Sequence, residues 1–234
     1  MSPVLSRIRR RLTGQGGFTL VEMIVVTVIL GVVLAAVQTT LIMTQKTVGQ
    51  NASRIDQTQQ AKLAVDAMSK TLRTAVLPAL LGCQTCDSTA FIQGGSNSVQ
   101  FYANINNDSN AIGPSRVSYT VNANGDLVET IQAPDAHAAN NFSYTYCTPG
   151  PGCTVLTRVL ARRVPTSLAV FTYYDANGAV VSPPLTATTL AQVDSIDLVV
   201  KVQDTSNGTP PATTFVTRVT LPNADAQAQS SPSP

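Results

Sequence analysis

The sequence contains no tryptophan, a single histidine and few charged residues, which make up 12% of its 234 positions. A catalytic triad or a histidine-based metal site would need a suitable partner near His137, and the sequence supplies no second histidine. Because His137 follows Pro134-Asp135-Ala136, we interpret it as a solvated loop residue. These absences argue against an enzyme, and we expect no bound metal and no cofactor.

Charge is also missing from a long stretch near the N-terminus. No charged residue occurs in 23–45, and Glu22 is an acid at the edge of this apolar run. As an α-helix, the 20 residues 18–37 would span about 30 Å, the thickness of the hydrocarbon core of a bilayer. A carboxylate costs roughly 2.5–3.5 kcal/mol at mid-membrane and less near its edge, so we expect Glu22 to have a partner of opposite charge.

A short basic leader precedes the apolar run, and its four arginines are Arg7, Arg9, Arg10 and Arg11. Basic residues stay in the cytoplasm, so we expect a single pass through the cytoplasmic membrane with the N-terminus inside. An ordinary secretory signal would have a shorter apolar core, and its best cleavage site would be Leu34-Ala35-Ala36-Val37, which leaves Glu22 unexplained. A plain signal anchor is a second alternative. Cleavage after Gly17 is a third, and it would keep the apolar run on the mature protein.

The segment Gly17-Phe18-Thr19-Leu20-Val21-Glu22 resembles the N-terminal motif of the type IV pilin superfamily, a Gly followed by Phe-Thr-Leu-x-Glu. The residues that this resemblance implies for recognition by a prepilin peptidase are Gly17, Phe18, Thr19, Leu20 and Glu22. It further implies cleavage between Gly17 and Phe18 and N-methylation of the new amine of Phe18. Residues four apart share a helix face, so we expect the Phe18 ammonium and the Glu22 carboxylate to neutralise each other. In a filament, the resemblance implies that Glu22 pairs with the terminal amine of a neighbouring subunit.

The chain has four cysteines, Cys83, Cys86, Cys147 and Cys153, all outside the membrane in this topology. An even count in an oxidising compartment favours two disulfides, with three possible connectivities. A predicted hairpin, with strands 142–147 and 153–160, would bring Cys147 and Cys153 together, which leaves the pair Cys83–Cys86 by elimination. The Cys83-Gln84-Thr85-Cys86 segment is also compatible with a redox dithiol or half of a zinc site, although no cytosolic context or nearby histidine supports either.

Beyond the apolar run, hydrophobic residues at steps of three and four predict that the helix continues to Leu77, before Pro78 and Gly82. The predicted stripe comprises Val48, Ala52, Ile55, Val65, Met68, Leu72 and Val76. We expect it to pack on a sheet. A helix that is apolar first and amphipathic afterwards resembles the lollipop stick of pilins.

After Cys86 the hydrophobic period changes to two, which predicts about eight to ten short strands in hairpins and an α+β fold with antiparallel sheets. Turn-forming residues in 122–126 and 175–178 support two of the hairpins. The expected parts are a cleaved leader (1–17), a transmembrane helix (18–37), its amphipathic continuation (38–82), a β-rich domain (83–222) and a disordered tail (223–234).

Segments of the β-rich part, Val99-Gln100-Phe101-Tyr102, Arg116-Val117-Ser118-Tyr119 and 171–178, resemble the J-type minor pseudopilins of type II secretion and the W-type minor pilins of type IV pili. The resemblance implies a minor subunit in a tip complex that primes polymerisation. It implies a prepilin peptidase, other pilin subunits and the membrane as partners, and a final place in a cell-surface or envelope filament. The competing interpretation is an anchored adhesin or a DNA-uptake receptor displayed on a pilin stalk.

Two other sets of residues have some of the chemistry of a binding site. The loop 104–110 is rich in oxygen ligands, but it lacks the EF-hand spacing and has one carboxylate, Asp108, so we expect no metal there. Arg158, Arg162 and Arg163 form a basic cluster, yet on a strand the last two would face opposite sides. Four of the 15 basic residues lie in the leader, so the rest of the chain lacks the charge expected of a direct nucleic-acid site.

Overall fold

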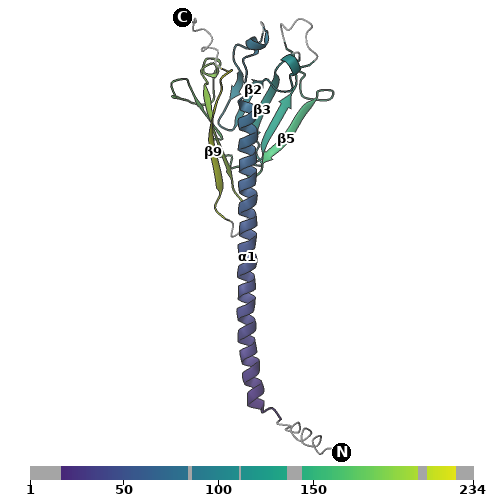
Figure 1. Ribbon diagram of the computed structural model, residues 1–234, viewed down its shortest axis with the longest axis vertical. Helices are drawn as coiled ribbons and strands as arrows, with labels where there is room; N and C mark the ends of the chain where they lie inside the picture. The colour runs from purple at the N-terminus through teal and green to yellow at the C-terminus, as the bar shows by residue number, and fades with distance from the viewer. Residues whose placement is uncertain (1–16, 84–85, 111, 136–143, 205–209, 225–234) are drawn as a thin grey trace, which may run out of the picture. The chain divides into compact units, whose positions relative to one another are not determined.

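The computed structural model describes residues 17–83, 86–110, 112–135, 144–204 and 210–224 (Figure 1). The chain divides into two compact units, residues 1–49 and 50–234. Helix α1 (Leu20–Leu72) contributes to both units, and its residues from Gln50 onward belong to the second. The predicted long helix is therefore confirmed, and it is continuous because its 53 residues contain no proline.

The C-terminal end of α1 lies at Leu72, whereas the sequence predicted Leu77. The residues that follow leave the helix because they hydrogen-bond to a strand instead. The amide of Val76 donates to the carbonyl oxygen of Tyr102 at 2.9 Å, and a single β-bridge joins Ala75 to Ala103. A long-range contact thus ends the helix before Pro78 does.

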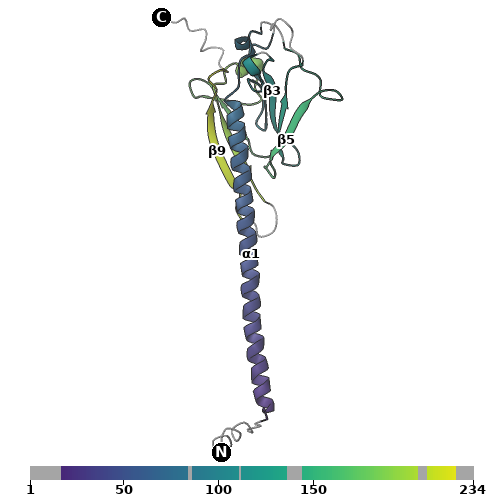
Figure 2. The same cartoon turned by 45° about the vertical axis from the view of Figure 1, so that its right-hand side comes forward.

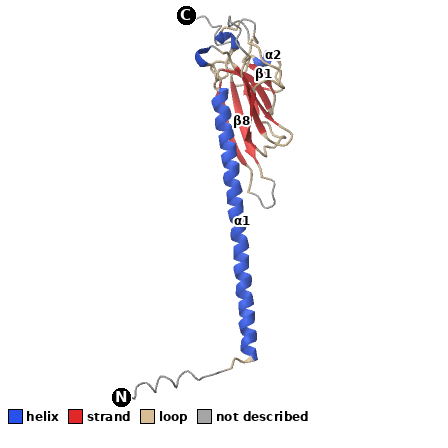
Figure 3. Ribbon diagram, turned by 90° about the vertical axis from the view of Figure 1, so that its right-hand side faces the viewer, coloured by secondary structure: helices blue, strands red, loops and turns tan. Residues whose placement is uncertain are grey.

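The second unit contains two antiparallel sheets (Figure 3). The first has the strand order β1-β2-β3-β4-β5, and the second has the order β7-β6-β8-β9. The strands of the first sheet are β1 (Phe91–Gly94), β2 (Ser98–Ala103), β3 (Ser115–Val121), β4 (Leu127–Gln132) and β5 (Val155–Ala161). Those of the second are β6 (Phe171–Tyr174), β7 (Val180–Val181), β8 (Ser195–Val202) and β9 (Thr213–Thr220). Three short helices complete the described part: η1 (Pro78–Leu81), η2 (Asp108–Asn110) and α2 (Ala187–Leu190). The α+β fold with antiparallel sheets is confirmed.

One face of α1 packs on the sheets and contributes to the hydrophobic core of the second unit. Its buried residues are Gln57, Ala61, Ala64, Val65, Met68 and Leu72. The largest fully buried rings of the core are Phe91, Phe101, Tyr119, Phe171 and Tyr173. The first part of the predicted stripe was wrong, because Val48, Ala52 and Ile55 are exposed. Small side chains such as Ala61 and Ala64, which let the helix approach the sheets closely, mark the buried face instead.

Hydrogen bonds near β1 join the two sheets, and the segment around Leu185 covers the side of β1 that does not pair with β2. The amide of Leu185 donates to the carbonyl oxygen of Gly94 at 2.8 Å, and the Tyr173 hydroxyl donates to that of Gly95 at 2.9 Å. The Val170 amide also donates to the carbonyl oxygen of Ser96. As a result, β5 and β9 lie at the outer ends of this arrangement.

Both predicted turns form as asparagine- and aspartate-stabilised loops. Between β3 and β4, Asn122 Oδ1 accepts from the amides of Asn124 and Asp126, each at 2.9 Å. Between β6 and β7, Asp175 Oδ1 accepts from the amides of Asn177 and Ala179. These side chains therefore serve the turns themselves.

The predicted strand 142–147 was wrong in its described part, because residues 144–147 have no strand structure, and residues 142–143 lie outside the described residues. Within the described residues β5 pairs with β4 alone, so the predicted hairpin between 142–147 and 153–160 does not form there. Side chains hold the segment instead. The hydroxyl of Tyr144 donates to the carbonyl oxygen of Leu81 at 2.8 Å, and that of Tyr146 donates to the carbonyl oxygen of Pro114 at 2.6 Å.

Gly113 makes this anchoring possible, and its replacement tests it. Its φ is +107°, and a Cβ there would lie 2.4 Å from the Tyr144 ring. We expect Gly113→Ala to lower the free energy of unfolding by about 1–2 kcal/mol, because it combines backbone strain with displacement of the ring. Chemical denaturation of the full chain in detergent measures the loss. Gly178→Ala is the matched control, since its φ is +78° and no atom lies within 4 Å of the added Cβ. Equal losses in the two variants would contradict the anchoring role.

Candidate functional site

The N-terminus of α1 is capped by a residue of the recognition motif. The amide of Glu22 donates to Thr19 Oγ1 at 3.2 Å, and the amide of Met23 donates to the Thr19 carbonyl oxygen. Thr19 thus occupies the N-cap position and Glu22 the third helical position, the spacing of a capping box. Sequence reasoning missed this role, although Thr-x-x-Glu before an apolar run is its recognised signature. The carboxylate of Glu22 also lies in the first turn, where it interacts favourably with the helix dipole.

Phe18 lies outside the helix, which corrects one step of the sequence argument. It precedes the cap Thr19, and α1 begins at Leu20, so Phe18 and Glu22 do not share a helix face. A shared helix face therefore does not support this pairing, and neutralisation of Glu22 by the amine of its own chain stays a prediction. Among the described residues, Glu22 forms no salt bridge.

The hydroxyl groups of the apolar part of α1 are bonded within the helix. Thr27 Oγ1 donates to the carbonyl oxygen of Ile24 at 2.9 Å, and Thr39 Oγ1 donates to that of Ala35 at 2.8 Å. Thr40, Thr44 and Thr47 make the same kind of bond to the residue four positions earlier. These groups need no outside partner in lipid, where unsatisfied polar groups cost several kcal/mol. The helix is long and apolar enough to cross a membrane, and its residues up to Gly49 are exposed.

The three arginines of the sequence cluster do not form a basic patch. Arg158 pairs with Glu129, while Arg163 pairs with Asp56 at 2.8 Å and with Asp204 at 3.1 Å. Arg162 and Arg163 lie beyond the end of β5, so the expectation that they alternate on a strand was wrong. Acidic partners therefore neutralise two of the three charges.

Glu129 is the buried ionisable side chain that sequence reasoning missed. It lies on β4 with its side chain 1% exposed, and both of its oxygens accept hydrogen bonds from Arg158. The Tyr119 hydroxyl donates to Glu129 Oε1 at 2.8 Å. Burial raises the pKa of Tyr119 above its ordinary value, and the neighbouring Glu129 raises it further. No local pattern marks such a residue, because its neutralising partner comes from β5, 29 residues along the chain.

The cysteines form two disulfides in the second unit. Cys83 bonds to Cys86, and Cys147 bonds to Cys153, with a Cα–Cα distance of 5.6 Å in each pair. Gln132 Nε2 donates to the carbonyl oxygen of Cys147 at 2.6 Å and so links the second disulfide to β4.

An arginine lies against two tyrosines beside these loops. The guanidinium carbon of Arg116 lies 3.9 Å from the centre of the Tyr146 ring and 5.7 Å from that of Tyr102. The Tyr102 hydroxyl donates to Asp87 Oδ2 at 2.6 Å. This cluster ties the segment after residue 143 to β2 and β3.

The asparagine-rich loop 104–110 is held together by its own side chains. Asn107 Nδ2 donates to Asn104 Oδ1 at 2.8 Å, and Asn107 Oδ1 accepts from the amides of Ile112 and Gly113. Asp108 begins the short helix η2. In the part of the chain that the structure describes, no three His, Cys, Asp or Glu side chains come together as a group able to hold a metal ion.

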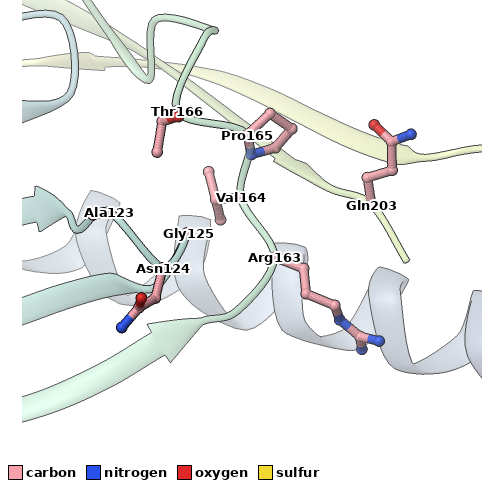
Figure 4. Close-up of a pocket in the computed structure, with 8 residues that line it drawn as sticks. All are labelled: Ala123, Asn124, Gly125, Arg163, Val164, Pro165, Thr166 and Gln203. Atoms are coloured by element: carbon pink, nitrogen blue, oxygen red, sulfur yellow. The ribbon is translucent and has the colours of Figure 1, made fainter. Parts of the chain in front are cut away.

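One pocket of about 400 Å³ opens between the β3–β4 turn and the ends of β5 and β8 (Figure 4). Its lining residues are Ala123, Asn124, Gly125, Arg163, Val164, Pro165, Thr166 and Gln203. They include no carboxylate, thiol or imidazole, and the charge of Arg163 is already paired with two aspartates. The pocket therefore brings together no nucleophile and base.

Other predicted features lie outside the described residues: most of the leader (1–16), His137 and most of the C-terminal tail (225–234).

Two comparisons bear on the site. The family model described as the prokaryotic N-terminal methylation motif matches residues 12–37. The matched range includes Gly17, Phe18 and Glu22 together with the apolar first part of α1. No curated protein matches the chain.

Proposed function

Because its N-terminal methylation motif places the chain among type IV pilin-like proteins, we propose that it is a minor pilin or pseudopilin of a type IV pilus or type II secretion-like filament. The observation that carries the proposal is the junction at residues 17–22, where a non-helical Gly17-Phe18 pair meets a capped apolar helix bearing Glu22. Pilin-like proteins are generally structural subunits, and the proposed role is assembly.

Processing creates the charge that Glu22 needs. Cleavage between Gly17 and Phe18 by a prepilin peptidase would turn the amide of Phe18 into a terminal amine, and N-methylation keeps its positive charge. In the filament, the pairing proposed is between chains, with the amine of one subunit against Glu22 of the next. Such a pair would fix the axial register of the helices.

The apolar part of α1 serves two environments in this proposal. Before assembly its exposed hydrophobic residues lie in the lipid of the cytoplasmic membrane, with the basic leader inside and the second unit outside. In the filament the same residues pack against neighbouring α1 helices. The partners are therefore the peptidase, the membrane and other pilin-like subunits.

The minor-subunit role rests on the resemblance of the β-rich part to the J-type and W-type subunits, and on the absence of proline from α1. A second candidate is an adhesin or DNA-uptake receptor displayed on a pilin stalk. Deletion of the gene separates the two: loss of filaments supports an initiating minor subunit, and normal filaments with lost adhesion or uptake support a receptor.

Mass spectrometry of the mature chain tests processing directly. We expect the first residue to be a methylated Phe18, and we expect Gly17→Leu to retain the leader and lack the methyl group. The variant is a matched control because nothing lies within 4 Å of a Cβ at this position, so the substitution disturbs no described contact. A mature chain that starts beyond Ala36 would show a conventional signal peptide and reject the proposal.

A further inference from the structure

Strands β5 and β9 are the free edges of the two sheets. Within the described residues, no strand pairs with the outer side of either one. Of the other two edges, β1 is covered by the segment around Leu185, and β7 is two residues long. An edge strand exposes unpaired amides and carbonyls, which makes it a template for another chain.

The direction of β5 is opposite to that of α1. An isolated antiparallel bridge joins Ala103, the last residue of β2, to Ala75, just past the end of α1. Strand β2 thus runs toward that end of the helix, and the antiparallel order β2-β3-β4-β5 reverses the direction three times. At the far end of β5, the amide of Arg162 donates to Gln60 Oε1, twelve residues before Leu72.

The direction of β9 is the same as that of α1. Its first residue, Thr213, pairs with Val202 at the end of β8, and the Ser53 hydroxyl donates to nearby Asp204 at 2.7 Å. Just past its last residue, the carbonyl oxygen of Asn223 accepts from the amide of Leu77. The strand therefore runs from the level of Ser53 to the level of Leu77.

The two free edges are complementary in direction and length. They lie on opposite sides of the second unit's part of α1 (Figures 1 and 2). When two copies lie beside each other with parallel α1 helices, β5 of one copy runs antiparallel to β9 of the other. With 7 and 8 residues, the strands span about 24 and 27 Å, and β5 is regular from Val155 to Val159, before a register shift against β4 at Leu160. One ladder can therefore extend along this part of β5 and the facing part of β9.

The side chains of both edges suit pairing. Neither strand contains proline or lysine, two residues that commonly protect an edge. Each has one arginine, and each arginine is neutralised within its own sheet, Arg158 by Glu129 and Arg218 by Asp197. Exposed apolar side chains are available on both edges, with Val159 44% and Val216 64% exposed. Repulsion between the two edges is therefore small.

We propose that β5 of one chain pairs with β9 of a second copy, which joins the first sheet of one copy to the second sheet of the next. The contact uses two different surfaces, so it does not close into a two-fold dimer. The proposal rests on the proposed filament role in one respect, because a filament is what keeps neighbouring α1 helices parallel.

Cysteine crosslinking between two tagged forms of the full chain tests the pairing in membranes. One form carries Val159→Cys and the other Val216→Cys, and the four native cysteines are in disulfides. With a short bis-maleimide, we expect the mixed β5–β9 product to exceed each same-strand product at least fivefold, since facing Cβ atoms of paired strands are about 5 Å apart. Thr157→Cys with Thr220→Cys is a second pair at exposed positions, in case one valine variant fails to fold. In the register in which Val159 faces Val216, these two residues are diagonal neighbours about 7–8 Å apart, within reach of the crosslinker.

Val180→Cys on β7 is the matched control, because Val180 is exposed to a similar extent and lies on the edge that the proposal does not use. It should give no excess of product with Val159→Cys. Predominant β5–β5 or β9–β9 products would indicate a two-fold contact, and absence of the mixed product would exclude the pairing; either result overturns the proposal. The methylation state of Phe18, measured in the same sample, shows separately whether the proposed function has failed.

Discussion

Replacement of Glu22 by glutamine is expected to leave membrane insertion, cleavage after Gly17 and methylation of Phe18 intact, and to lower incorporation into filaments more than tenfold. Glutamine keeps the size of the side chain and is itself accepted at the third position of a capping box. The bond from the Glu22 amide to Thr19 also remains, so α1 still begins at Leu20. The variant therefore removes only the negative charge. In an apolar filament core, loss of that charge leaves the Phe18 ammonium without its partner.

The measurement compares methylated chain in sheared filaments with methylated chain left in the membrane. Thr27→Val is the matched control, because it removes a polar group from the same helix that is already bonded to the Ile24 carbonyl oxygen. It should assemble normally. Glu22→Asp, which keeps the charge but shortens its reach, should fall between the wild type and Glu22→Gln. Assembly of Glu22→Gln at the wild-type level would refute pairing between Glu22 and the amine.

Replacement of Arg158 by alanine is expected to lower the free energy of unfolding of the second unit by about 2–3 kcal/mol. The variant leaves the buried Glu129 carboxylate with the Tyr119 hydroxyl as its remaining described hydrogen-bond partner. The loss falls below that of a fully buried pair because the Arg158 side chain is 52% exposed, so water can reach part of the site after truncation. Denaturant unfolding of the full chain in detergent provides the measurement.

Arg218→Ala is the matched control for Arg158→Ala. Arg218 also makes two hydrogen bonds to a carboxylate on the adjacent strand, Asp197, at 2.6 and 2.8 Å. The Asp197 side chain is 19% exposed, compared with 1% for Glu129, so solvent compensates for its lost partner more fully. We expect a clearly smaller loss of stability. Equal losses in the two variants would show that burial of Glu129 does not determine the effect.

Local patterns were sufficient to predict several elements. Period-two alternation identified β2, β3 and β8, where Val99, Val117 and Ile196 are buried as expected. Turn residues predicted the loops at Asn122 and Asp175. These elements are determined by their own sequences, because residues near in the chain supply both the hydrophobic face and the turn.

Long-range contacts determined what the sequence did not predict. Helix α1 ends at Leu72 because Val76 bonds to Tyr102, and residues 144–147 are held as an irregular segment by the Tyr144 and Tyr146 hydroxyls, which donate to Leu81 and Pro114. At the candidate site, the motif from Gly17 to Glu22 was evident from the sequence, whereas the position of Phe18 outside the helix was not. A spacing of four residues places two side chains on one helix face only when both are helical, and α1 starts after its N-cap, Thr19.

The threonine hydroxyls of α1 donate hydrogen bonds within their own helix, and this affects the transfer of a subunit from the membrane to a filament. Thr27 and Thr39 donate to carbonyl oxygens of their own helix, so these bonds persist whether lipid chains or protein side chains surround them. Transfer from the membrane to a filament then exchanges one apolar environment for another. The interaction of Glu22 is the main polar change in that exchange. A single charge pair would thus determine the balance between subunits in the membrane and subunits in the filament. Because little else changes, both extraction from the bilayer and return to it would be energetically accessible.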